Sequence, residues 1–114
     1  HSQGWSKIVD YMKIRNNLLE KLHWIVLPTF KLKTIIRLKK IGFNQKTISK
    51  RLNVTESCVS QLIQRKRGTY ENYSEKELQH IDNLVSQINL EEENLELEIL
   101  KKATKFFEMG DKNE

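Results

Sequence analysis

The chain has 114 residues and a formal net charge of +5, with 38% hydrophobic and 31% charged side chains. This length allows one domain with a modest core and an extension. No apolar run approaches the roughly 20 residues of a membrane-spanning helix, and no secretory signal pattern is visible. One cysteine excludes an internal disulfide framework, and three scattered histidines do not form a metal-binding pattern. We therefore expect an intracellular, cytoplasmic protein with no metal and no cofactor.

Charge divides the chain into two unlike halves. Residues 1–73 hold 15 Lys and Arg against 4 Asp and Glu, a net charge of +11. Residues 74–114 hold 5 against 11, a net charge of −6. A strongly basic half is the electrostatic footprint expected of a DNA-binding protein. A generic solvated basic surface is the alternative.

The first helix is predicted over residues 5–27, because apolar residues recur on one face with charged residues largely opposite. Pro28 should prevent its smooth continuation. We expect this helix to pack on the core or to contact a second subunit, and residues 1–4 and 109–114 to be frayed ends. Its apolar positions are Trp5, Ile8, Val9, Met12, Leu19 and Leu22.

A second helix is predicted from Thr29, as its N-cap, to Ile41, with Gly42 ending it. Lysines and one arginine crowd its polar side, and some of them could reach DNA phosphates. Its apolar positions are Phe30, Ile35, Ile36, Leu38 and Ile41.

Residues 45–64, QKTISKRLNVTESCVSQLIQ, are typical of two short helices joined by a tight turn. Asn44 and Thr55 are suited to cap the two helices, and Asn53 tolerates the left-handed backbone that such a turn requires. Ser49 is small where the helices must approach each other. The shared core would come from Ile48, Leu52, Val54, Val59 and Leu62. This pattern indicates a helix-turn-helix, whose second helix enters the DNA major groove.

The outward side chains of the second motif helix are candidates for reading bases. Glutamine can hydrogen-bond adenine through two atoms, and serine can donate or accept. The candidate base contacts are Ser57, Ser60, Gln61 and Gln64. Candidate phosphate contacts lie at the helix starts and in the cationic run after the motif, and they are Gln45, Lys46, Thr55, Arg65, Lys66 and Arg67. We expect Cys58 to be a small buried filler and residues 69–73 to form a polar loop, with a small wing there as the alternative.

Residues 28–88 resemble the Cro/repressor-type (XRE-like) helix-turn-helix family and are similar to archaeal single-motif transcriptional regulators. The matching residues are Pro28, Gly42, Gln45, Ile48, Ser49, Leu52, Val54, Thr55, Val59, Ser60, Arg67 and Gly68. The chain departs from the family at Asn53, where glycine is usual, and at Ser49, where alanine is usual. The resemblance implies DNA binding by an all-α domain of four to five helices, and it carries over no effector.

The acidic half begins with a capping-box sequence at Ser74. Its apolar spacing permits one long helix or coiled coil, but a second capping-box pattern at residues 89–92 favours two helices, over residues 75–88 and 90–108. The first should complete a DNA-binding domain of residues 28–88. The second, in the segment 89–108, carries more apolar surface than a small monomer can cover. We expect it to form a homodimer, with packing on the helix of residues 5–27 as the alternative.

The sequence therefore predicts a homodimeric, all-α protein that binds double-stranded DNA at a palindromic site, as a nucleoid-associated transcriptional regulator. No nucleophile–base pattern and no phosphate-binding glycine loop is visible, so an enzyme is not expected. Neither a membrane nor a small-molecule effector is expected as a partner. The alternatives are a DNA segregation or replication protein that coats a repeated site, and a protein–protein adaptor.

Overall fold

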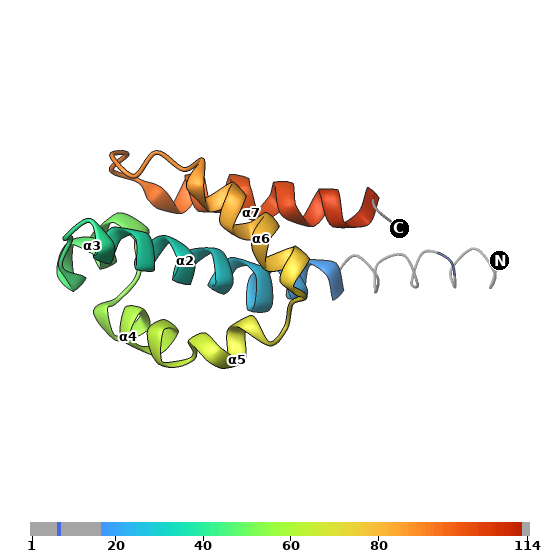
Figure 1. Cartoon of the computed structure of the whole chain (residues 1–114), viewed down its shortest axis with the longest axis horizontal. Helices are drawn as coiled ribbons and strands as arrows, with labels where there is room; N and C mark the ends of the chain where they lie inside the picture. The colour runs from blue at the N-terminus through green and yellow to red at the C-terminus, as the bar shows by residue number, and fades with distance from the viewer. Residues whose placement is uncertain (1–6, 8–16, 113–114) are drawn as a thin grey trace.

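The computed structural model describes residue 7 and residues 17–112 of the chain, without the side chains of residues 109–112. Every regular element in this part is a helix, so the predicted all-α class is confirmed there. The elements in order are the π-helix η1 (Leu22–Val26), α2 (Leu27–Lys40), α3 (Gln45–Leu52), α4 (Glu56–Gln64), α5 (Lys66–Tyr70), α6 (Glu75–Ser86) and α7 (Leu95–Lys112). Helix α2 runs through the middle, with α7 on one side of it and α4 and α5 on the other (Figure 1).

The predicted break at Pro28 is wrong, because residues 17–40 form one continuous helical stretch. In η1 the N–H of Leu27 donates to the carbonyl of Leu22, five residues back. Pro28 follows in the first turn of α2, where the wider preceding turn accommodates a residue without an N–H. Thr29 is not an N-cap: it is buried inside the helix, and its hydroxyl donates to the carbonyl of Ile25 at 2.8 Å.

Most of the first predicted helix lies outside the described residues, including Trp5, Ile8, Val9 and Met12. Within the described part, Leu22 packs against the core, but Leu19 is 53% exposed and does not belong to it. The C-terminal end of this helix, η1, contacts both α2 and α7. Within residues 22–26, Leu22 and Val26 pack on the core, whereas Trp24 is 72% exposed.

Helix α2 supplies the centre of the core. Its side chains Phe30, Ile35 and Leu38 are fully buried, as predicted. They pack with residues from all the longer helices, namely Ile48, Leu52, Val59, Ile81, Val85, Leu95 and Ile99. The prediction fails at Ile41, which follows the last turn of α2 and is 60% exposed. Gly42 ends the helix as expected, with φ +105° in a region that favours glycine.

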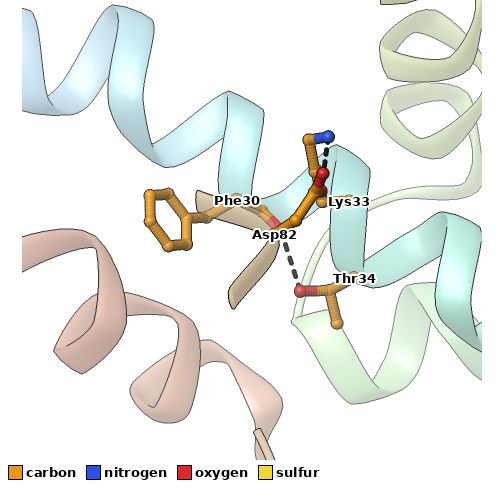
Figure 2. Close-up of polar contacts among 4 residues, drawn as sticks. All are labelled: Phe30, Lys33, Thr34 and Asp82. Atoms are coloured by element: carbon orange, nitrogen blue, oxygen red, sulfur yellow. Dashed lines mark hydrogen bonds and ion pairs between the residues drawn. The ribbon is translucent and has the colours of Figure 1, made fainter. Parts of the chain in front are cut away.

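Two polar contacts of α2 are drawn in Figure 2. The hydroxyl of Thr34 is buried and donates to the carbonyl of Phe30 at 2.8 Å, which satisfies it inside the core. The ammonium group of Lys33 forms an ion pair with Asp82 of α6, although only 12% of the lysine side chain is exposed. This pair joins the basic helix α2 to the acidic half of the chain.

The acidic half forms two helices, as predicted, but with different ends. The capping box is present: the Ser74 hydroxyl accepts from the N–H of Glu77 at 3.2 Å, and the Glu77 carboxylate accepts from the N–H of Ser74 at 2.9 Å. Helix α7 begins five residues later than predicted, at Leu95. Asn89 does not cap it, because its side chain accepts from the N–H of Glu91 at 3.1 Å and forms a local turn instead.

Two arginines hold the linker between α6 and α7. Arg37 of α2 donates to the carbonyls of Val85 and Ile88, where α6 ends. Arg51 of α3 donates to the carbonyl of Leu90 at 2.7 Å. The carbonyl of Val85 also accepts from the N–H of Ile88 at 3.0 Å, so the guanidinium of Arg37 adds a second donor there, whereas Arg51 bonds a carbonyl in the middle of the linker. The linker is thus fastened to the two helices that precede the predicted recognition helix.

The apolar face of α7 is buried in the same core. Leu95, Ile99 and Ala103 are fully covered, and Phe106 is 8% exposed with its ring centroid 5.9 Å from that of Phe30. Most of the apolar residues that led us to expect a dimer through this helix are therefore covered by the chain itself. Helix α7 contacts η1, which is the end of the first predicted helix, as the intramolecular alternative expects. Leu100 remains 40% exposed.

Candidate nucleic-acid interface

A tight turn joins α3 and α4, and it has the backbone that the sequence predicts. Asn53 has φ 56° and ψ 46°, the left-handed conformation. Its N–H donates to the carbonyl of Lys50, and the N–H of Val54 donates to that of Ser49 at 3.0 Å, which is the Schellman pattern of a helix end. The hydroxyl of Thr55 then caps α4 by accepting from a backbone N–H. Only three residues therefore separate the end of α3 from the start of α4.

The start of α3 and its contact with α4 also follow the prediction. The side chain of Asn44 accepts from the N–H of Thr47 at 2.8 Å, so it caps α3. Ser49 is 6% exposed, and its hydroxyl donates to the carbonyl of Lys46 at 2.8 Å. A small residue whose hydroxyl is satisfied within its own helix allows α4 to approach closely. The pair α3 and α4 is a helix-turn-helix in its backbone.

The faces of α4 separate cleanly into buried and exposed. Val59 is fully buried, whereas Ser57, Gln61 and Gln64 are exposed and lie at positions i, i+4 and i+7 on one side of the helix. Ser60, the fourth candidate base contact, is half-buried. Cys58, expected to be buried, is partly exposed. Three of the four predicted base contacts therefore share one solvent-facing surface.

Gln45 has a role within the fold that the sequence does not reveal. Its amide nitrogen donates to the carbonyl of Glu56 at 2.9 Å and to the hydroxyl of Ser60 at 2.7 Å. An amide nitrogen has two hydrogens, so both are engaged and none is left for a phosphate in this arrangement. The predicted phosphate contact of Gln45 stays a prediction, whereas its brace between α3 and the first turns of α4 is observed.

The other predicted phosphate contacts lie on the surface. Thr55, Lys46, Arg65, Lys66 and Arg67 are all exposed. Among the described residues, none of these four cations forms an ion pair with a carboxylate, so their charges remain available.

We expected residues 69–73 to form a polar loop. That prediction is wrong, because residues 66–70 form the short helix α5. Only residues 71–74 lie between α5 and α6. No strand is present among the described residues, so this part of the chain has no β-wing.

Several cationic side chains of residues 1–73 make contacts within the folded chain instead of pointing freely into solvent. Lys33 pairs with Asp82 and lies 4.5 Å from the ring centroid of Tyr70. Burial raises the pKa of Tyr70, and the nearby Lys33 lowers it in part. Arg37 and Arg51 bind backbone carbonyls of the α6–α7 region. The net charge of residues 1–73 therefore overstates the positive charge that is free on the surface of the described residues. Nothing in the spacing of these residues marks them as structural.

In the part of the chain that the structure describes, no three His, Cys, Asp or Glu side chains are grouped so that they could hold a metal ion, and no helix is long and apolar enough to cross a membrane. Comparison of the chain with protein-family models, with curated proteins and with solved structures gave no match. Its function must therefore be argued from this surface and its chemistry.

Proposed function

We propose that this chain binds double-stranded DNA sequence-specifically through α4 and acts as a transcriptional regulator. The observation that carries the proposal is the exposed row of Ser57, Gln61 and Gln64 on a helix held by a helix-turn-helix turn. These side chains offer donors and acceptors of the kind that read base edges in the major groove. The motif residues that resemble the Cro/repressor-type family support the same function.

The cations beside this row would fix the protein on the DNA backbone. Lys46 lies in the first turn of α3, and Arg65, Lys66 and Arg67 follow α4 directly. If all four contact phosphates, log K should fall with log salt at a slope of roughly −3 to −4, at about −0.9 per phosphate. These contacts position the protein without reading sequence, whereas the α4 side chains supply the discrimination.

The proposal concerns one DNA-binding unit on one half-site. A homodimer on a palindrome was expected because α7 carries a large apolar face, and that face is buried within the chain. This removes the reason to expect a two-fold dimer through α7.

Selection of bound sequences from a random DNA pool, followed by gel-shift titrations, tests the proposal. Gln61→Ala should relax base preference at one or two positions, at about 1–3 kcal/mol of lost discrimination. Lys66→Ala should weaken all sequences alike and make the salt slope shallower by about one unit. Gln79→Ala is the matched control, because Gln79 is an exposed glutamine of α6, away from the motif.

Two results would contradict the proposal. One is a failure of the wild-type chain to enrich any sequence, or to bind duplex DNA at low salt. The other is the same change of affinity and of base preference for Gln61→Ala and Lys66→Ala, which would mean that α4 does not read bases. In either case the adaptor alternative would be favoured, with the basic surface incidental.

A further inference from the structure

A groove lies between α2 and the end of α4, on the side of α2 away from α7. Its volume is about 310 Å³, and its floor is formed by Leu32, Ile36 and Ile63. Three lysines line it as well, Lys39, Lys40 and Lys66, and no carboxylate of the described residues does. An apolar floor with a cationic rim is complementary to an apolar strip that carries negative charge.

The described part of the chain holds such a strip on α7. Leu97 is 49% exposed and Leu100 is 40% exposed. Glu93 precedes the helix and Glu96 lies in its first turn, four residues before Leu100 and so beside it. Lys101 lies on the other edge of this strip, and its Nζ is 3.8 Å from Oε1 of Glu98. Exposed leucines flanked by glutamates match the groove in both polarity and sign of charge.

The strip and the groove face opposite sides of the molecule. Phe30 of α2 faces α7, while Ile36 lies six residues later and so points about 120° away around α2. On α7, Leu97 is two residues from the buried Ile99 and points away from the core. Figure 1 has α7 and the α4–α5 segment on opposite sides of α2. One chain therefore cannot fill its own groove with its own strip.

We propose that the α7 strip of one copy docks into the lysine-rimmed groove of a second copy. Because the two surfaces differ and lie on opposite sides, the contact is head-to-tail and continues from copy to copy instead of closing as a two-fold dimer. On α4, Gln61 and Ile63 are two residues apart and point about 160° away from each other, so the contact leaves Gln61 free, whereas Lys66, a proposed phosphate contact, lines the groove. The proposal does not depend on DNA binding.

If the chain also binds DNA, this contact would place copies in tandem along it. The expected target would then be half-sites in tandem instead of a single palindrome. The contact is small, and interfaces of this size are weak. We therefore expect association at roughly 100 μM protein and monomers at about 1 μM.

Sedimentation velocity of the full chain without DNA tests the contact directly. The weight-average mass should rise continuously with concentration at low salt and fall back as added salt shortens the Debye length from about 30 Å to about 3 Å. Leu97→Ser with Leu100→Ser should remain monomeric throughout. Both leucines are exposed, so the fold should be kept, which circular dichroism checks.

Charge reversal gives a sharper second test. Lys39→Glu with Lys40→Glu makes the groove rim acidic, and Glu93→Lys with Glu96→Lys makes the strip basic, so each variant alone should be monomeric. An equimolar mixture should associate again, because each variant's groove then matches the other's strip. Lys50→Glu with Lys76→Glu is the control, since it changes the net charge equally on exposed lysines of α3 and α6, and it should associate like wild type.

Several outcomes would overturn the proposal. A monomer at all concentrations would do so, as would a discrete dimer whose mass does not grow further. Failure of the mixed variants to associate, or a loss of association in the Lys50/Lys76 control, would show that net charge and not this surface governs self-association. None of these substitutions changes Gln61 or Arg65–Arg67, and the sedimentation samples contain no DNA, so a failure here is distinguishable from a failure of the proposed DNA binding.

Discussion

Removing the amide of Gln45 should uncouple α4 from α3. The nitrogen donates to the Glu56 carbonyl at 2.9 Å and to the Ser60 hydroxyl at 2.7 Å. Each bond contributes roughly 0.5–1.5 kcal/mol, and the first is exposed, so we take values near the lower end. Gln45→Ala should therefore lower the free energy of unfolding by about 1 kcal/mol. For a chain of this size that corresponds to a Tm lower by roughly 4 °C.

A double-mutant cycle isolates the Gln45–Ser60 bond from other effects of each substitution. Ser60→Ala alone loses the same bond but gains helix propensity of about 0.5 kcal/mol, so its net cost should be small. The double variant should show a coupling energy of about 0.5–1 kcal/mol. Equilibrium urea unfolding followed by circular dichroism measures all four corners of the cycle.

The matched control pairs Gln45→Ala with Ser57→Ala. Ser57 is an exposed serine of the same helix and has no hydrogen bond to Gln45. These two substitutions should be additive to within about 0.3 kcal/mol. A coupling energy for Gln45 and Ser60 no larger than for this control pair would refute the bracing role. In DNA selections, Gln45→Ala should reduce base preference more than non-specific affinity.

Three further predictions concern single positions. Asn53→Ala should lower the free energy of unfolding by about 1 kcal/mol in urea titrations, because φ is 56° there, whereas Asn53→Gly should stay within about 0.5 kcal/mol of wild type. Nε2 of His80 is buried beside the ring of Phe106 and has no hydrogen-bond partner among the residues that the structure describes. His80→Phe should therefore raise Tm by roughly 4 °C in calorimetry, and an equal or lower Tm would contradict this. The hydroxyl of Tyr73 donates to the Ile25 carbonyl, and burial raises the pKa of Tyr73 above the ordinary value of 10.0. The stability that this tyrosine contributes should therefore be retained below pH 10 and be lost as the pH rises through the pKa of the folded state. Tyr73→Phe should be less stable at pH 7 and lose less on going to alkaline pH, as urea unfolding across this pH range would measure.

Local chemistry made the centre of this fold predictable from sequence. Asn44, Asn53, Thr55 and Ser74 act through hydrogen bonds and backbone angles within three or four residues, and each has the predicted role. The exposed face of α4 follows in the same way, because helical periodicity places Ser57 and Gln61 opposite the apolar side. Pro28 is the local signal that misled, since a proline in a first turn is tolerated and the π-turn before it could not be read from the residues.

The roles of the charged residues required the tertiary structure. Lys33, Arg37 and Arg51 have the same sequence signature as Lys46 or Lys66, yet their partners are Asp82, Val85 and Leu90, about 40 to 50 residues away. Contacts over such separations depend on how the helices are packed, which composition and spacing do not encode.

The same distinction explains α7 and the grouping of candidate residues. The sequence alone determined that residues 95–107 have an apolar helical face, but only packing decided that α2, α6, η1 and α3 of the same chain cover it. It determined which side chains of α4 point outward, whereas packing decided that Gln45 is engaged with Ser60 and that three lysines rim an apolar groove. Periodicity and capping are properties of a few neighbouring residues, while burial is a property of the whole chain.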